Sequence, residues 1–525
     1  MIIEGGKGIG RIELTNIPLP EYVTNPYHPI YTASGHILLG YQLPGEADSN
    51  KDYYHIAVMD DDGSNFHDIF ADSVPAHPTA NGGLRLMPFA DNTRVFLGDY
   101  ILECPPDFGS CKSAALVRVR YPSRVVDDPR VMRHWSEIVV APDNRHVAWT
   151  TLYKVGGALN FLGVLGKVGG LYEIHSACVI SSMDVMEDDP QNAGCYRIKP
   201  MRGGEIKQFI HGGLGLSLVG AIGGALPGSV EQDLTSDAVI PVTNQPGYDE
   251  TTIYSPDEKL GITMSTRNSP GTNFAILGLL PRPYALLVTM GLAFHVYLYA
   301  VAGVRKFRKG NIGPALIDIA RSKADPAYFG VPLNDFTSDF IYHSPMSWHP
   351  SGMSVMWPEV TRGGGKGRVR AAHLLDYKPG AAVPAVVTPD APPYAGSIDA
   401  FEPSGFAMPD HGNFIGKHSG YAEFTTAGMG SARISYHDYS DDGRSFLNGA
   451  EFIANDARVG NTIYQSKITL NGEDEGEMDL RLTFIRKDWD SPTSLSYDTA
   501  EDGLPASRGF ARYNGKTIRI EDMEK

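Results

Sequence analysis

A short two-part pattern recurs along the chain and constrains its fold more than any other feature. Each copy has an apolar run, a turn rich in Pro, Asp, Asn or Gly, and then alternating β-branched and aromatic residues. The clearest copies are "VVAPDNRHVAWTTL" (139–152), "YSPDEKLGITMSTR" (254–267) and "SWHPSGMSVMWPE" (347–359), and weaker ones are "LMPFADNTRVFLGDY" (86–100) and "IYTASGHILLGYQ" (30–42). Alternation on both sides of a tight turn predicts a β-hairpin.

The spacing of these hairpins predicts an all-β fold. Copies begin near residues 30, 85, 137, 205, 251 and 346, so most are roughly 45–70 residues apart, a period typical of β-propeller blades. Each hairpin would form the two inner strands of one blade. We therefore expect a β-propeller of about six blades, with seven as the alternative. The 58 glycines and 37 prolines among 525 residues fit a chain with many turns.

The composition of the sequence and the length of its alternating runs change after the last hairpin. Residues 391–414 are rich in Pro, Gly and Ala without periodicity, and we interpret them as a linker. Residues 415–525 contain longer alternating runs with Asp-Gly and Asn-Gly turns, which predict a separate antiparallel β-sheet domain. The propeller would then occupy residues 1–390, interrupted by an apolar, helical insertion over 280–325.

The insertion contains "ALLVTMGLAFHVYLYAVAGV" (285–304), which is uncharged, long enough to span a membrane and followed by "RKFRKG". Hairpins on both sides of it would belong to one closed ring, and a single span would separate them. We therefore predict a helix that packs on protein or lies at a membrane surface through residues 285–310, rather than a span. His295 in its middle is also easier to place in protein than in lipid.

Charge and cysteine content limit the other classes. A formal net charge of -16 argues against nucleic-acid binding, because an acidic chain repels phosphates. Cys104 and Cys111 form one close pair and Cys178 and Cys195 another, without the spacing of a zinc site. Two local disulfides would imply an oxidising compartment. The first residues do not resemble a signal peptide, so either the chain is cytoplasmic with free thiols or a leader has been removed.

Function is expected where the innermost strands enter, because these positions converge at one mouth of the propeller channel. Glu137, Glu250 and Asp99 are the candidate catalytic carboxylates at such positions, and His211 represents the fourth repeat. The candidate substrate-binding residues of the same mouth are Arg267, His134, Trp149, Tyr248, His343 and Trp348.

Three functions fit this set. Paired carboxylates such as Glu137 and Glu250 could act as acid and nucleophile or base on a glycosidic bond, with no cofactor. Alternatively, His28, His134 and His343 could bind a divalent metal ion that stabilises an enolate, as in a sugar-acid lyase. A non-catalytic propeller that serves as a binding platform is the third class.

The stretches "VFLGDYILECPPDFGSC", "SEIVVAPDNRHVAWTTL", "GEIKQFI", "QPGYDETTIYSPDEKLGITMSTRNS", "ALIDIARSKADPAYFG", "MSWHPSGMSVMWPE" and "ARISYHDYSDDGRSFLNGAE" resemble, in order, the fungal saponin hydrolase family. Its members are secreted propeller enzymes that cleave a glucuronide from triterpenoid saponins. The resemblance implies a glycoside hydrolase that removes a sugar, glucuronic acid among the candidates, from a small-molecule glycoside with a bulky apolar aglycone. It adds Asp318 as a reserve carboxylate, Arg267 as the residue that would hold a substrate carboxylate, and a Cys104–Cys111 disulfide.

Two further glycine-rich apolar stretches, residues 156–166 and 212–228, flank other hairpins. If they and residues 285–304 all lay over the channel mouth, they would form an apolar lid suited to such an aglycone. The alternative is packing between subunits or on a membrane surface.

Overall fold

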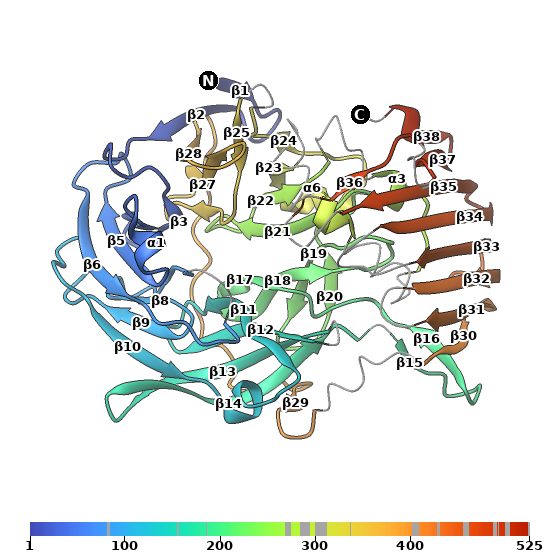
Figure 1. Cartoon of the computed structure of the whole chain (residues 1–525), viewed down its shortest axis with the longest axis horizontal. Helices are drawn as coiled ribbons and strands as arrows, with labels where there is room; N and C mark the ends of the chain where they lie inside the picture. Colours follow the sequence, from blue (N-terminus) through green and yellow to red (C-terminus); the bar gives the residue numbers. More distant parts are fainter. Residues whose placement is uncertain are drawn as a thin grey trace.

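Six antiparallel blades, arranged around a ring, form the larger part of the molecule (Figure 1); five have four strands each, and the sixth has its innermost strand in two pieces and one added strand at its edge. The computed structural model describes residues 1–80, 84–154, 157–184, 186–267, 275–283, 295–299, 312–335, 338–401, 409–427, 431–454, 461–486, 491, 493–498 and 505–522. Within these residues the expected β-propeller is confirmed, with six blades.

The first three blades take up the amino-terminal third of the chain. Blade 1 contains β3 (Tyr27–Tyr31), β4 (Ile37–Tyr41), β5 (Tyr53–Met59) and β6 (His67–Ser73); blade 2 contains β7 (Met87–Pro88), β8 (Arg94–Phe96), β9 (Tyr100–Glu103) and β10 (Ala115–Arg120); blade 3 contains β11 (Val131–Val140), β12 (His146–Tyr153), β13 (Ala158–Val168) and β14 (Leu171–Ser182). Short helices α1 (Glu46–Ser49) and α2 (Ser123–Val126) lie in their connections.

The last three blades follow a connection that leaves the ring. Blade 4 contains β17 (Ile206–Ile210), β18 (Gly215–Gly220), β19 (Gly228–Asp233) and β20 (Val239–Pro241); blade 5 contains β21 (Asp249–Tyr254), β22 (Leu260–Ser265), β23 (Gly313–Asp318) and β24 (Val331–Pro332); blade 6 contains β25 (Phe340–Tyr342) and β26 (Ser347–Trp348), β27 (Ser354–Thr361), β28 (Gly367–Leu374) and β2 (Arg11–Ile17). The amino-terminal β2 pairs with β28 and so closes the ring, and β1 (Ile2–Glu4) extends that blade.

Turn chemistry explains why the hairpin pattern recurs. In blade 3, Asp143 Oδ1 accepts hydrogen bonds from the backbone N–H groups of Arg145 and His146, at 2.8 and 3.0 Å. Asn144, between Asp143 and Arg145, has a left-handed backbone with φ 61°, which asparagine tolerates better than most residues. Each copy of the pattern therefore builds the first two strands of a blade, and its Asp, Asn and Gly residues belong to the scaffold.

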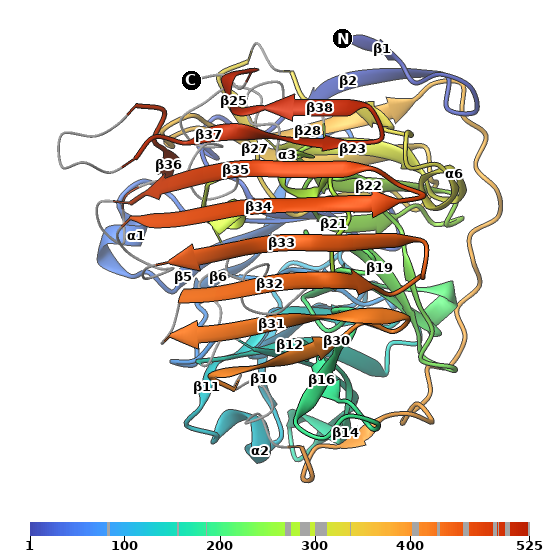
Figure 2. The same cartoon turned by 90° about the vertical axis from the view of Figure 1, so that its right-hand side faces the viewer.

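The carboxy-terminal residues form a second, eleven-stranded sheet that stands beside the propeller (Figure 2). Its strands are β30 (His411–Ile415), β31 (Ser419–Ala427), β32 (Ser431–Ser440), β33 (Ser445–Ala454), β34 (Thr462–Gly472), β35 (Gly476–Ile485), β36 (Ser494–Leu495), β37 (Arg508–Tyr513), β38 (Lys516–Arg519), and the hairpin β15 (Met186–Asp188) and β16 (Cys195–Ile198). This hairpin comes from the connection between blades 3 and 4, and β16 pairs with β30 in parallel. Local sequence patterns do not show such long-range pairing.

One apolar core joins the propeller to this sheet. It contains Leu260 and Trp357 from blades 5 and 6 together with Tyr436 and Tyr464 from the sheet, all buried. Burial of apolar area across the boundary is the main force holding the two parts together.

The segment after β28 crosses the face of the propeller that carries the hairpin turns, and is the orange connection to β29 (Gly396–Ser397) in Figure 1. The N–H groups of Val383, Val386 and Thr388 donate in turn to the turns of blades 5, 4 and 3, at 2.8, 2.9 and 3.0 Å. β29 pairs with β14, and β30 begins at His411. Strands therefore occupy part of the range 391–414, which the sequence suggests is a linker.

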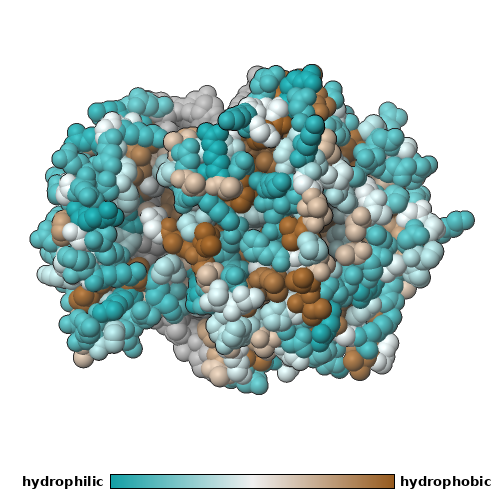
Figure 3. Space-filling model, turned by 180° about the vertical axis from the view of Figure 1, so that it is seen from behind, coloured by the Kyte–Doolittle hydropathy of each residue, from teal (hydrophilic) through white to brown (hydrophobic). Residues whose placement is uncertain are grey.

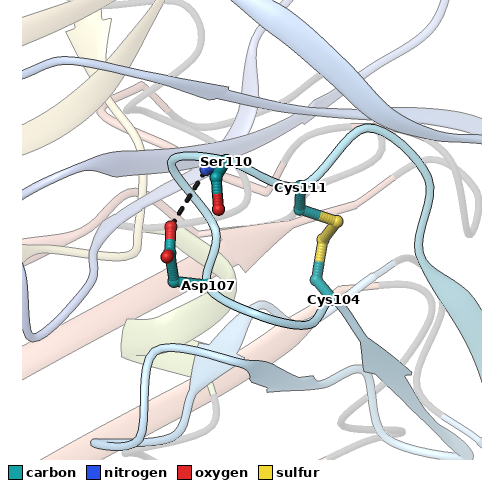
Figure 4. The surroundings of a disulfide bond; sticks show 4 residues. All are labelled: Cys104, Asp107, Ser110 and Cys111. Carbon is teal, nitrogen blue, oxygen red and sulfur yellow. Dashed lines mark hydrogen bonds between the residues drawn. A yellow bond between two sulfur atoms is a disulfide. The ribbon is translucent and has the colours of Figure 1, made fainter.

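The four cysteines behave as two different pairs. Cys104 and Cys111 form a disulfide that closes the β9–β10 loop of blade 2, where the N–H of Ser110 donates to Asp107 Oδ1 at 2.9 Å (Figure 4). The second expected disulfide is wrong: Cys178 and Cys195 are free thiols, because β14 belongs to the propeller and β16 to the other sheet.

The insertion lies between β22 and β23, so the expected range 280–325 is too long: β23 and helix α6 (Ile319–Ala324) already belong to blade 5. Before the apolar stretch, α3 (Ala275–Gly278) packs beside the carbonyl oxygen of Pro246. Of residues 285–304 only 295–299 are described; they are helical, and the His295 ring lies 5.0 Å from that of Phe484 in β35. The remainder of that stretch and the basic residues 305–310 lie outside the described residues, so the full helix stays a prediction.

Two other expectations about apolar segments are settled by the blades. Residues 156–166 fall largely in β13, and residues 212–228 include β18, so neither stretch as a whole is a lid. No helix in the described part of the chain is long and apolar enough to cross a membrane. Seen from behind Figure 1, the surface has small apolar patches within a mainly polar face (Figure 3).

Candidate functional site

Three carboxylates from blades 3, 4 and 5 meet around one lysine at the mouth where the innermost strands begin. Lys207 Nζ, on β17, lies 2.8 Å from Glu205 Oε2 and 3.3 Å from Oε1 of both Glu137 and Glu250. Glu205 immediately precedes β17, Glu137 lies on β11 and Glu250 on β21. The propeller thus brings to Lys207 two carboxylates that are distant along the chain, Glu137 at 70 residues and Glu250 at 43 residues.

A second cation, Arg85, approaches the same cluster from the start of blade 2. Its guanidinium forms an ion pair with Glu137. On the other side, Arg85 Nη1 lies 3.2 Å from His28 Nε2, and the N–H of Leu86 donates to His28 Nδ1 at 3.2 Å. Burial, followed by the charge of Arg85, holds the pKa of His28 well below its usual value, so His28 stays neutral and packs against a cation.

The environment shifts the pKa values of two acids in the cluster in opposite directions. Burial raises the pKa of Glu137, and the charges of Glu205 and Glu250 add to this against the opposing effect of Arg85 and Lys207. For Glu205 burial acts in the same direction, but the charge and hydrogen bond of Lys207 outweigh it and lower the pKa. Carboxyl pKa values shifted in opposite directions within one site are what a general acid beside an ionised carboxylate requires.

Glu137 and Glu250 are close enough to act on one bond. Because one oxygen of each lies 3.3 Å from the same nitrogen, those two oxygens are no more than about 6.6 Å apart. Glu250 is also held by the hydroxyl of Tyr248, which donates to its Oε2 at 3.1 Å. Burial and the neighbouring Glu250 charge raise the pKa of Tyr248 well above its usual value, so this hydroxyl remains a donor.

Arg267 supports the scaffold rather than facing a ligand. Its Nη2 donates to Asp249 Oδ2 at 2.7 Å, and the two side chains are only 1% and 2% exposed. Its Nε donates to Ser265 Oγ at 2.8 Å. This guanidinium is therefore committed to a buried ion pair beside Glu250.

Asp99 and His134 form a separate pair. His134 Nε2 lies 2.8 Å from Asp99 Oδ1, and its Nδ1 lies 3.0 Å from Thr79 Oγ1. His134 is completely buried, and its ring meets those of His77 and Tyr121 edge-on. The pair links blade 2 to blade 3 next to the mouth, and neither residue forms a hydrogen bond or ion pair with Lys207 or its carboxylates.

Several sequence candidates lie elsewhere. Asp318 caps α6, accepting from Arg321 N at 2.9 Å, and pairs with Leu260 at the far end of β22 from Ser265 and Asp249, about 17 Å along the strand. His211 follows the last residue of β17 and so also lies at the opposite mouth. Contrary to the expectation from the sequence, neither Asp318 nor His211 lies at the mouth that holds Lys207.

The aromatic candidates are mostly core residues. Trp149 is fully buried on β12 and stacks on Phe161 at 5.1 Å between ring centres. Trp348 is buried on β26, where its indole N–H donates to the carbonyl of Ile253 at 2.9 Å. Both support packing within or between blades. His343 is exposed near His28, and its Nδ1 lies 3.1 Å from the carbonyl oxygen of Ser344.

The metal alternative finds no support in the geometry. His28 and His134 are engaged by different partners, Arg85 and Leu86 for the first and Asp99 and Thr79 for the second. Among the described residues, no three His, Cys, Asp or Glu side chains are grouped so that they could hold a metal ion.

Sequence reasoning missed Arg85, Glu205 and Lys207. All three stand at or just before the start of an innermost strand, as Glu250 does, and Glu137 stands where β11 begins its regular pairing with β12, so the same positional rule applies to them. In blade 4 the pattern was assigned to the wrong end of the innermost strand. That strand begins at Ile206, so Glu205 and Lys207 lie at the mouth, whereas His211 follows its last residue.

Comparisons with known proteins add only a general likeness. No family model and no curated protein matches the chain. Similar solved structures include TolB from Agrobacterium tumefaciens (11% identity, TM-score 0.26, 69% of this chain and 83% of that one) and a prolyl endopeptidase (9%, 0.32, 94% and 55%). A third is Trypanosoma rangeli sialidase in complex with sialic acid (10%, 0.33, 97% and 88%). At such TM-scores the likeness carries no argument about function, which rests on the site itself.

Proposed function

We propose that the protein is a glycoside hydrolase that uses Glu137 as general acid and Glu250 as nucleophile. The observation that carries this proposal is the convergence of the two carboxylates on Lys207 in a buried site where the pKa of Glu137 is raised. The raised pKa favours the protonated form of Glu137, whose proton would pass to the leaving-group oxygen. Lys207 and Tyr248 hold Glu250 in a fixed orientation for attack on the anomeric carbon.

The separation of the two groups favours a two-step course with retention. An upper limit of about 6.6 Å between the oxygens fits the about 5–5.5 Å of retaining enzymes better than the roughly 6.5–9.5 Å of inverting ones. In the first step Glu250 displaces the aglycone while Glu137 donates its proton to the departing oxygen. In the second step Glu137 takes a proton from water as the water oxygen attacks the anomeric carbon, which breaks the bond to Glu250 and releases the sugar.

The remaining parts of the proposal come from the sequence resemblance. The aglycone would be bulky and apolar, as in a triterpenoid saponin, and the reaction would need no cofactor. Secretion would follow from the same resemblance, and a disulfide at Cys104–Cys111 is typical of an oxidising compartment. Metal analysis of the purified protein tests the cofactor part, since a stoichiometric divalent ion required for activity would contradict it.

Hydrolysis of aryl glycosides tests the roles. We expect Glu250→Gln to lower kcat/KM by about 10³-fold or more on every leaving group, because the nucleophile is lost, and Glu137→Gln by about 10²–10⁴-fold on poor leaving groups. Dinitrophenyl leaving groups need no acid, so the Glu137→Gln loss should largely disappear with them. Glu473→Gln, on the exposed surface, is the control. Wild-type protein that is inactive on a broad panel of glycosides would refute the proposal.

A further inference from the structure

Among the described residues, the charged groups at the mouth are matched, and no cation is left over for a charged substrate. Three carboxylates, Glu137, Glu205 and Glu250, meet two cations, Arg85 and Lys207. Lys207 is only 5% exposed, and its ammonium group has three donors for three carboxylate acceptors. Arg85 is paired with Glu137 and packed against His28. Even with Glu137 protonated, the cluster as a whole is neutral rather than positive.

The residue expected to hold a substrate carboxylate is also committed. Arg267 Nη2 is paired with Asp249 and Nε with Ser265; Nη1 has no hydrogen-bond partner among the described residues but is inaccessible to solvent, so a substrate carboxylate would reach it only by opening the buried pair with Asp249. Breaking a buried ion pair in this way leaves an uncompensated charge, which is strongly unfavourable.

A sugar placed between Glu137 and Glu250 must bring its ring substituents close to Glu205. The Glu205 side chain is 31% exposed, about twice as much as either of the other two acids, so it is the carboxylate that faces incoming ligand most openly. A negative charge on the sugar would meet this carboxylate at short range in a partly desolvated site, where repulsion is strong.

We infer that the site selects glycosides whose sugar carries no negative charge, and that Glu205 sets this selectivity by matching the remaining positive charge among the described residues of the mouth. This inference rests on the proposed glycoside hydrolase function. It departs from the glucuronide that the sequence resemblance implies, and it assigns to Glu205 a role in specificity rather than in the chemical step.

The test compares p-nitrophenyl glucoside, galactoside, glucuronide and galacturonide of matched linkage. We expect wild-type kcat/KM to be at least 100-fold higher for the better neutral sugar than for its uronide. Glu205→Gln removes the charge while keeping the shape and frees Lys207 to meet a carboxylate. We expect it to narrow the neutral-to-uronide ratio at least tenfold, whereas Glu473→Gln, with its exposed side chain, should leave the ratio unchanged.

Inhibition of the wild-type protein gives a readout that needs no variant. A neutral sugar lactone should inhibit at a concentration at least tenfold lower than the corresponding lactone with a carboxylate. Equal or better hydrolysis of uronides would overturn the inference while leaving the glycosidase proposal standing. An unchanged ratio in folded Glu205→Gln would overturn the role of Glu205 alone. Inactivity on all four substrates and on the broader panel would instead refute the proposed function.

Discussion

Lys207 is the residue on which the charged cluster depends. Its ammonium group is nearly inaccessible to solvent and compensates three carboxylates from three blades. Those carboxylates, rather than its own burial, raise its pKa, since burial alone would lower it. Without this cation the acids would repel one another in a region of low dielectric.

We therefore expect Lys207→Met to lower the free energy of unfolding by about 3–5 kcal/mol at pH 7, the usual result of leaving buried charges unpaired. The loss should shrink toward pH 4, because protonated carboxyls no longer repel. Urea unfolding at both pH values measures it. Lys167→Met is the matched control: Lys167 pairs with Glu103 at the surface, and its loss should be below about 1 kcal/mol. A uniform loss at both pH values would contradict this interpretation.

At the scale of elements, a buried ion pair joins the described part of the blade 5 insertion to the carboxy-terminal sheet. Arg282 Nε donates to Glu451 Oε2 at 3.0 Å, and both side chains are completely buried. The hydroxyls of Tyr436 and Tyr464 each donate to Glu451 at 2.7 Å. Arg282 is thereby anchored to β33.

Arg282→Met should destabilise the protein by about 3–5 kcal/mol, because Glu451 would remain charged in an apolar core. The double variant Arg282→Met with Glu451→Gln should recover at least a third of that loss, since the neutral amide oxygen still accepts from one tyrosine and the amide NH2 group donates to the hydroxyl of the other. Denaturant unfolding of the two single variants and the double variant gives the coupling. Arg512→Met, which breaks the exposed pair with Glu477, serves as control. Simple additivity of the two changes would show that Arg282 and Glu451 do not act together.

At the scale of the whole molecule, His211 makes the stability of the ring depend on pH. Its Nδ1 lies 2.8 Å from Glu258 Oε2 in blade 5 and its Nε2 lies 3.7 Å from Glu231 Oε2 in blade 4. Hydrogen bonds to Glu231 and Glu258 raise its pKa to about 9. A folded-state pKa above the unfolded value means that the charged histidine stabilises the folded ring.

This contribution is present in full below the ordinary pKa of histidine, about 6.5, and is lost as pH rises through about 9. We expect the wild-type melting temperature to exceed that of His211→Gln by several degrees at pH 6, and the difference to vanish near pH 10. Comparison with His67→Gln removes the effect of other titrating groups. A difference that stays constant between pH 6 and pH 10 would exclude a role for the His211 charge.

The features that the sequence alone predicts are those stabilised by contacts between residues close together in the chain. Asp143 and Asn144 bend the chain through contacts within three residues, so the hairpin pattern indicates the blades and their number. The same pattern indicates where each inner strand begins, which is why Glu137 and Glu250 could be chosen without a structure. It also distinguishes the longer strands of the carboxy-terminal sheet from those of the propeller.

The tertiary structure decided whatever depends on partners distant along the chain. Lys207 meets Glu137 and Glu250 only because the ring brings the entrances of three blades together. Asp318 also carries a carboxylate, but its place on β23 puts it at the end of a helix. The union of β16 with β30 and the burial of Arg282 against Glu451 are of the same kind. A turn is stabilised by contacts within a few residues, but the charge, burial and partners of a side chain are set by the closed fold, and these decide which carboxylate can do chemistry.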